Sequence, residues 1–93
     1  MPKFLIERNI PGASKLSADD LRGISAKSNE VVAGLKVPYN WVTSYVAGDK
    51  IYCVHEAESA EIIYRHAREG RFPADLVTEI ASQTGPETAN GRI

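Results

Sequence analysis

The chain has 93 residues, and its 11 Lys and Arg against 12 Asp and Glu give a formal net charge of −1. Hydrophobic residues make up 43% and charged residues 25%, which excludes a disordered chain and predicts one globular domain with one core. A single cysteine cannot form an intrachain disulfide, and no apolar run approaches the ~20 residues of a membrane span.

The first part of the chain predicts a strand followed by a helix. Alternating apolar side chains predict a strand near residues 2–9, in which Phe4 and Ile6 share one side. After a turn, Ser17 is a suitable N-cap, and acidic residues follow it in the first turn. Apolar residues then recur at helical spacing, so we expect a helix near residues 18–34.

The rest of the chain predicts a hairpin, a second helix and a last strand. Runs of β-branched and aromatic residues at 40–46 and 51–56 are separated by a tight turn, which is typical of two hairpin strands. Ser59 can cap a helix that continues to about residue 70. Alternation at 76–82 predicts a fourth strand.

This order of elements is that of the split βαβ, or ferredoxin-like, plan. We expect an α+β fold with a four-stranded antiparallel sheet and two helices on one face, over a single domain at residues 1–83. The polar segment 84–93 is expected to be a flexible tail. The open face of the sheet would carry Trp41, Tyr45 and Tyr52. Because a large exposed apolar face is unusual on a monomer, we expect a homodimer in which two sheets face each other as a dimeric α+β barrel.

The residues best suited to bind a metal ion are His66, Glu56 and His55. Imidazole and carboxylate groups suit nickel, zinc, copper or iron. The chain has no CxxC, HxH or HExxH spacing, so no chelate is specified by the local sequence. The alternative is a structural role, with His66 half-buried on its helix and hydrogen-bonded to the sheet, and with His55 on the surface of its strand.

Side chains alternate along residues 51–56, so Cys53 and His55 share one side of the strand, and Tyr52 and Glu56 share the other. Both sets include apolar neighbours, so this periodicity does not decide which set faces the helices. The expected role of Cys53 is that of a small buried side chain, because a nucleophilic thiol needs a partner that lowers its pKa.

The sequence argues against nucleotides, nucleic acids and membranes as partners. The chain has no phosphate-binding loop, nucleophile elbow or dinucleotide fingerprint, so nucleotide-dependent chemistry is not expected. Lys and Arg do not gather as nucleic-acid binding requires. Glu7 and Arg8 interrupt the stretch that a signal peptide would need to be apolar, so we expect a cytoplasmic protein without membrane contact.

Five segments carry a family resemblance: Met1 to Arg8, Trp41, Lys50 to Val54, Arg65 to Ala67, and Phe72 to Ala74. Together they resemble the small bacterial DUF4242 family, which includes a nickel-binding, nickel-responsive protein of actinobacteria. The resemblance spans roughly residues 2–82. It implies a ferredoxin-like subunit, a dimeric α+β barrel and a cytoplasmic nickel site. His66 matches the family's Arg-His-Ala segment, whereas His55 stands where members commonly have Tyr.

Two functions follow as hypotheses. The first is a small homodimeric protein that binds a divalent metal for nickel sequestration or nickel response, with His66, Glu56 and His55 as ligands. The alternative is a dimeric α+β barrel that acts as an enzyme or as a carrier for a small organic molecule. An interaction domain without a small ligand is the plainest form of this alternative.

Overall fold

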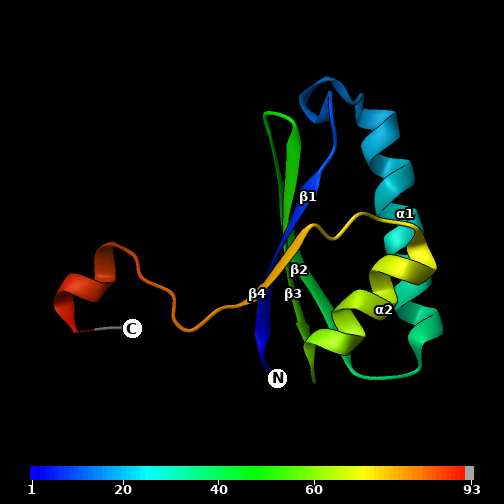
Figure 1. Cartoon of the computed structure of the whole chain (residues 1–93). Coiled ribbons are helices and arrows are strands. Elements are labelled where there is room, and N and C mark those ends of the chain that lie inside the picture. The colour runs from blue at the N-terminus through cyan, green and yellow to red at the C-terminus, as the bar shows by residue number, and fades with distance from the viewer. Residues whose placement is uncertain (92–93) are drawn as a thin grey trace.

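The computed structural model describes residues 1–91, and it has the predicted order of elements (Figure 1). The strands and helices are β1 (Lys3–Asn9), α1 (Ala18–Leu35), β2 (Tyr39–Ala47), β3 (Lys50–Ala57), α2 (Ala60–Gly70) and β4 (Leu76–Glu79). Two short 3₁₀ helices are also present, η1 (Ala13–Lys15) and η2 (Pro86–Asn90). The α+β fold expected from the sequence is confirmed.

The four strands form one sheet in the order β2-β3-β1-β4, with all neighbours antiparallel. Both helices cover the same face of this sheet, and the other face has no layer of described residues over it (Figure 1). This is the strand order of the split βαβ plan. The core therefore lies between the sheet and the helices.

The alternation of β1 decides which side chains enter that core. Phe4, Ile6 and Arg8 are buried on the helix side, whereas the residues between them are partly exposed on the other. The side chains of β3 alternate in the same way, which places Cys53 and His55 on the helix side. Burial thus shows which side chains of β3 face the helices, which the periodicity of the sequence did not decide.

Helix α1 begins as the sequence predicts. The backbone N–H of Asp20 donates to Ser17 Oγ at 3.0 Å, and the backbone N–H of Ser17 donates to Asp20 Oδ2 at 3.0 Å. This capping box satisfies N–H groups that a helix start otherwise leaves unpaired. Ser59 occupies the N-cap of α2 as expected, but its side chain makes no capping hydrogen bond.

A β-bulge in β2 corrects one prediction. The pairing with β3 shifts register between Trp41 and Thr43, so Val42 is an extra residue in the strand. A bulge reverses the alternation beyond it. Trp41 therefore faces the helices, whereas Tyr45 pairs with Tyr52 on the open face. The expectation that Trp41 shares the open face with these two tyrosines was wrong.

Strand β4 is shorter than the predicted 76–82. The backbone N–H of Ile80 donates to the Lys3 carbonyl at 2.8 Å, and Lys3 is the first residue of β1. Beyond that point β4 has no neighbouring strand to pair with. The chain then leaves the domain and forms η2 within the predicted tail (Figure 1). Residues 92–93 of that tail lie outside the described residues, and its flexibility stays a prediction.

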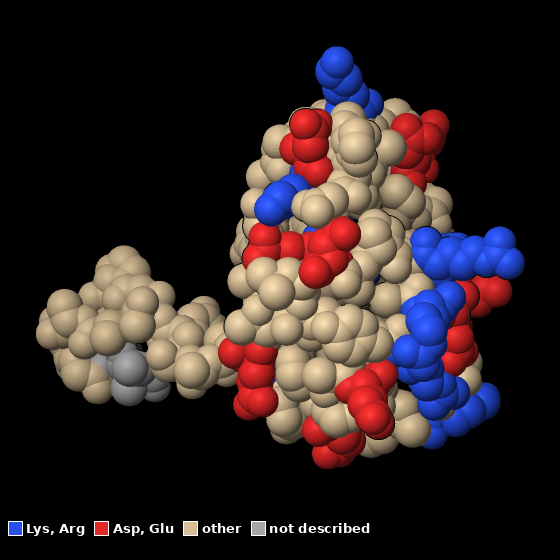
Figure 2. Space-filling model, viewed as in Figure 1, with Lys and Arg blue, Asp and Glu red and all other residues tan. Residues whose placement is uncertain are grey.

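Charged side chains of both signs lie on the surface. In the view of Figure 2, most Lys and Arg lie toward the helices, whereas Asp and Glu lie on both sides of the molecule. One ion pair joins Arg65 to Glu69 on α2 at 2.7 Å, and another joins Lys50 to Glu7 on the open face at 3.2 Å. Within residues 1–91, no helix has both the length and the apolar character that a membrane crossing requires.

Two glycine substitutions test the packing at the end of α2. A Cβ added to Gly70 would lie 2.3 Å and 2.6 Å from atoms of the Phe72 ring, which itself stacks on His66. We expect Gly70→Ala to lower the free energy of unfolding by about 1–3 kcal/mol through overpacking. Gly23→Ala, inside α1 with nothing within 4 Å of the added atom, should raise it by up to about 1 kcal/mol. Urea unfolding measures both, and equal effects would contradict this packing.

Candidate functional site

The structure places the three predicted metal ligands on two different faces of the sheet. His55 on β3 and His66 on α2 are both buried between the layers, with ring centroids 5.1 Å apart. Glu56 lies on the open face, where its carboxylate accepts a hydrogen bond from the Asn40 amide at 3.2 Å. The alternative of a surface position for His55 was wrong, since only 1% of this residue is exposed.

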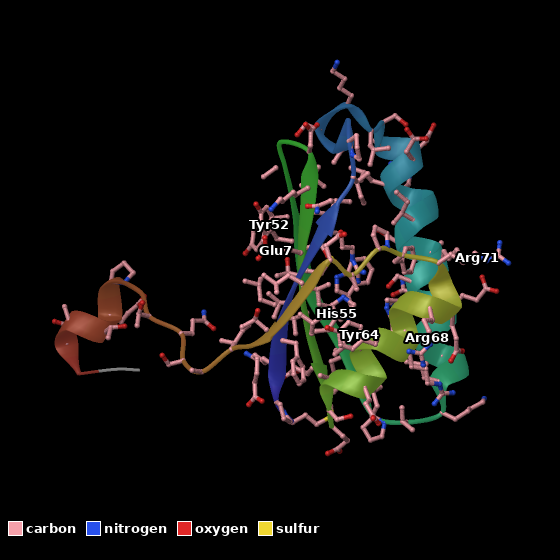
Figure 3. The ribbon with its side chains drawn as sticks, viewed as in Figure 1. Glu7, Tyr52, His55, Tyr64, Arg68 and Arg71 are labelled. Atoms are coloured by element: carbon pink, nitrogen blue, oxygen red, sulfur yellow. The ribbon has the colours of Figure 1, made fainter. Side chains whose placement is uncertain are left out.

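Figure 3 shows this division of the sheet. His55 points from the sheet toward α2, whereas Glu7 and Tyr52 lie on the opposite side. The chain thus brings together the two histidines, which are separated by a turn and part of a helix in the sequence. It does not bring Glu56 to them.

Aromatic rings hold the histidine pair in place. The His66 ring is stacked between Tyr39 and Phe72, at centroid distances of 5.2 Å and 5.5 Å. The Tyr39 ring also meets His55 edge-on, and the Tyr39 hydroxyl is hydrogen-bonded to His55 Nδ1 at 2.5 Å. We call Tyr39, His55, His66 and Phe72 the histidine cluster.

Each histidine has one ring nitrogen engaged by a hydroxyl group. His66 Nε2 lies 3.0 Å from Ser28 Oγ, so its hydrogen bond reaches α1 rather than the sheet. His66 Nδ1 is buried without a hydrogen-bond partner among the described residues. His55 bonds Tyr39 through Nδ1, which leaves Nε2 as its second nitrogen. A buried nitrogen without a hydrogen-bond partner costs about 1–3 kcal/mol of stability. The cluster therefore contains a ring nitrogen that could still bond to a ligand.

Burial keeps both imidazoles neutral. It lowers the pKa of His55 to about 3, with smaller contributions from the positive charges of His66 and Arg8. It lowers the pKa of His66 to about 4, again with Arg8 as a second cause. Burial also raises the pKa of the Tyr39 hydroxyl well above its ordinary value. At pH 7 the cluster therefore contains neutral imidazole, the form that binds metal ions.

Arg8 is a buried cation beside the cluster that was not among the predicted site residues. Only 5% of it is exposed. Its Nε–H donates to Cys53 Sγ at 3.4 Å, its Nη1 donates to the Pro73 carbonyl at 2.5 Å, and its guanidinium lies over the Phe72 ring. No Asp or Glu of residues 1–91 forms an ion pair with it. A buried Arg without a carboxylate is unusual.

A small cavity adjoins these polar groups. It has a volume of about 80 Å³, and Arg8, Trp41, Cys53, His55 and His66 contribute to its lining. The buried thiol accepts a second hydrogen bond, which the Ser44 hydroxyl donates at 3.0 Å. The buried position of Cys53 agrees with its expected role as a small core side chain.

The sequence of α1 explains why this space is not filled. The side chains that α1 contributes to the cavity wall are Leu21, Ile24, Ser25 and Ser28. Two of these four are serines, whose short side chains leave room under the helix. A single apolar stripe of large residues would have closed the gap.

The cluster does not by itself complete a metal site. Within the part of the chain that the structure describes, no group of three or more His, Cys, Asp or Glu side chains could hold a metal ion. The two histidines supply donors of one kind, and the nearest charged residue that acts on both is the cationic Arg8. Further ligands would have to be water, an anion or groups from a second copy.

Comparison with known proteins supports a nickel-related family. A family model described as "Nickel responsive protein SCO4226-like" matches residues 4–80. No curated protein matches the chain. Among solved structures, the crystal structure of SCO4226 from Streptomyces coelicolor A3(2) matches with a TM-score of 0.73 and 20% identity, over 88% of this chain and 99% of that chain. At this identity the structural match shows the fold alone.

Neutral burial of the histidines predicts a pH dependence of stability. The pKa values of about 3 for His55 and about 4 for His66 lie below the ordinary 6.5, so the unfolded chain binds these protons first as the pH falls. Their contribution is complete above pH 6.5 and is lost as the pH falls toward the folded-state values. The expected slope is up to about 1.4 kcal/mol per pH unit for each histidine.

Urea unfolding of metal-free protein between about pH 7 and about pH 4.5 measures this slope. His66→Phe keeps an aromatic ring between Tyr39 and Phe72 but cannot titrate, so it should remove about half of the slope. A wild-type stability that stays constant over this range would contradict the neutral burial of the pair.

Proposed function

We propose a nickel-binding function for this chain, which belongs to the family of SCO4226-like nickel-responsive proteins. In this proposal the protein is a homodimer that binds Ni²⁺ for sequestration or response, and the His55–His66 pair supplies the imidazole ligands. The observation that carries the proposal is the adjacency of two neutral histidines, each with a second ring nitrogen that forms no hydrogen bond with residues 1–91.

The chemistry of the pair suits nickel. Imidazole is a favoured ligand of Ni²⁺, and a neutral ring needs no proton removed by the metal. The hydroxyl groups of Tyr39 and Ser28 fix the orientation of the rings, as hydrogen bonds to metal-binding histidines commonly do. Water or an anion would fill the remaining coordination positions.

Calorimetric titration of untagged, metal-free protein with Ni²⁺ tests the site. We expect binding in the micromolar range or tighter, and His66→Ala should weaken it at least about tenfold because one imidazole ligand is lost. Glu56→Gln is the matched control, since Glu56 lies on the other face of the sheet and should leave the affinity unchanged.

Two results would refute this assignment. Unchanged Ni²⁺ binding in folded His66→Ala would remove His66 from the site. Loss of binding in Glu56→Gln, with His66→Ala unaffected, would move the metal to the open face. Circular dichroism of each variant shows whether the fold is kept.

The open face of the sheet supports the homodimer. Leu5 and Val54 lie at its centre, and Tyr45 and Leu76, exposed by 62% and 51%, flank them on the outer strands. The face also carries charged residues of both signs: Lys3, Glu7, Lys50 and Glu56. A surface that offers apolar groups and both charges can pair with itself across a two-fold axis, so the occupant we propose is a second copy of this chain.

Light scattering after size exclusion tests the dimer. The wild type is expected at twice the monomer mass, and Val54→Asp should shift it to the monomer because it places a charge at the centre of the apolar face. Tyr64→Asp, which changes an exposed side chain on α2, should stay dimeric. A monomeric wild type, or a dimeric Val54→Asp, would contradict the proposed interface.

A further inference from the structure

We propose that the cavity between α1 and the sheet binds a small monocarboxylic acid with an apolar chain, and that Arg8 pairs with its carboxylate. This inference concerns a second ligand and does not depend on nickel binding. It rests on the unpaired charge of Arg8, on the chemistry of the cavity wall and on the groove that leads out of it.

The charge of Arg8 is the first observation. Its contacts are to a thiol and a backbone carbonyl, and neither carries the negative charge that a buried guanidinium ordinarily has beside it. Arginine has more N–H donors than these contacts use. Its second terminal nitrogen, Nη2, forms no hydrogen bond with the described residues, and the Arg8 side chain is part of the cavity wall. An anion in the cavity would therefore find a charged donor already in place.

The wall of the cavity is the second observation. None of its lining residues is acidic, so nothing there opposes an anion. The hydroxyl group of Ser25 also lines it and can donate a hydrogen bond to a carboxylate. Apart from Arg8, the serines, Cys53 and the two neutral histidines, the rest of the wall is aliphatic and aromatic, which favours a ligand with an apolar body over a strongly hydrated ion such as phosphate.

The size and opening of the cavity define the shape of the ligand. A volume of about 80 Å³ is a little more than half of the ~150 Å³ that a benzene-binding cavity offers, so it fits a carboxylate head and the first carbons of a chain. A surface groove of about 400 Å³ adjoins the cavity. Leu21, Trp41 and Val46 line both spaces. A short unbranched chain would lie along these side chains and leave the protein at the edge of β2.

Hexanoate is a suitable probe, and Trp41 reports its binding. Trp41 is the only tryptophan of the chain and lines both the cavity and the groove, so its fluorescence should change on titration. With protein freed of metal by a chelator, we expect a dissociation constant of about 1 mM or lower. Acetate, which lacks the chain, and 1-hexanol, which lacks the charge, should each bind at least about tenfold more weakly.

Two variants test the charge of Arg8 and the volume of the cavity separately. Arg8→Gln should weaken hexanoate at least about tenfold and leave 1-hexanol unchanged, because only the ion pair is lost. Ser25→Phe should weaken both probes, since the larger ring fills the space under α1. Ala26→Phe is its control, because Ala26 lies on the exposed side of the same helix and does not line the cavity.

Each outcome decides the proposal. No response of wild-type fluorescence to hexanoate overturns it, and so does equal binding of hexanoate by folded Arg8→Gln. Equal affinity for hexanol, or tighter binding of phosphate than of hexanoate, overturns the assignment of a carboxylate with an apolar chain. If Arg8→Gln fails to fold, the comparison of hexanoate with hexanol and the Ser25→Phe variant still decide. Because metal is absent throughout, failure here is distinct from failure of the nickel site.

Discussion

Tyr39 is the residue on which the interior of this domain depends. Its ring stacks on His66 of α2, and its hydroxyl bonds His55 of β3, so one side chain at the start of β2 links three elements. Burial of polar groups is costly unless hydrogen bonds replace those made with water. Tyr39 supplies one such bond to His55, and the Ser28 hydroxyl supplies one to His66, whose Nδ1 has no partner among the described residues.

The same arrangement divides the sheet into two chemically different faces. Alternation along β1 and β3 sends Arg8 and His55 inward, and sends Glu7, Tyr52 and Glu56 outward. The inner face holds the two neutral imidazoles and the guanidinium of Arg8. The outer face holds apolar and charged groups suited to a second copy. A substitution on one face can therefore change one property and leave the other intact.

Much of the fold could be predicted from local patterns. Periodicity, the cap at Ser17 and the turns between strands gave the element order, because these features depend on residues close together in the chain. The bulge after Trp41 could not be predicted, since an extra residue in a strand is visible only in the pairing with its neighbour. It reversed the side on which Trp41 lies.

The site was predictable only in part. His55 and His66 were identified by residue type, but their adjacency is a long-range contact between a strand and a helix that no local spacing encodes. Glu56 was included as a carboxylate donor near the hairpin, but consecutive strand residues point to opposite faces, and Glu56 lies on the face away from His55. Arg8 follows Phe4 and Ile6 at two-residue spacing, so assigning those two to the core would have indicated that Arg8 is buried as well. Charged side chains are seldom fully buried, but the structure shows that Arg8 is buried.

Arg8 also connects the two ligands proposed for the inner face. Its positive charge lowers the pKa of both histidines, and the same field disfavours a dication bound to them. A carboxylate paired with Arg8 would reduce that field, so each ligand would make the binding of the other more favourable. Such coupling is reciprocal by thermodynamic necessity. If both proposals hold, the Arg8 guanidinium, which has no carboxylate partner among residues 1–91, is the feature through which a small acid and a metal ion would act on each other.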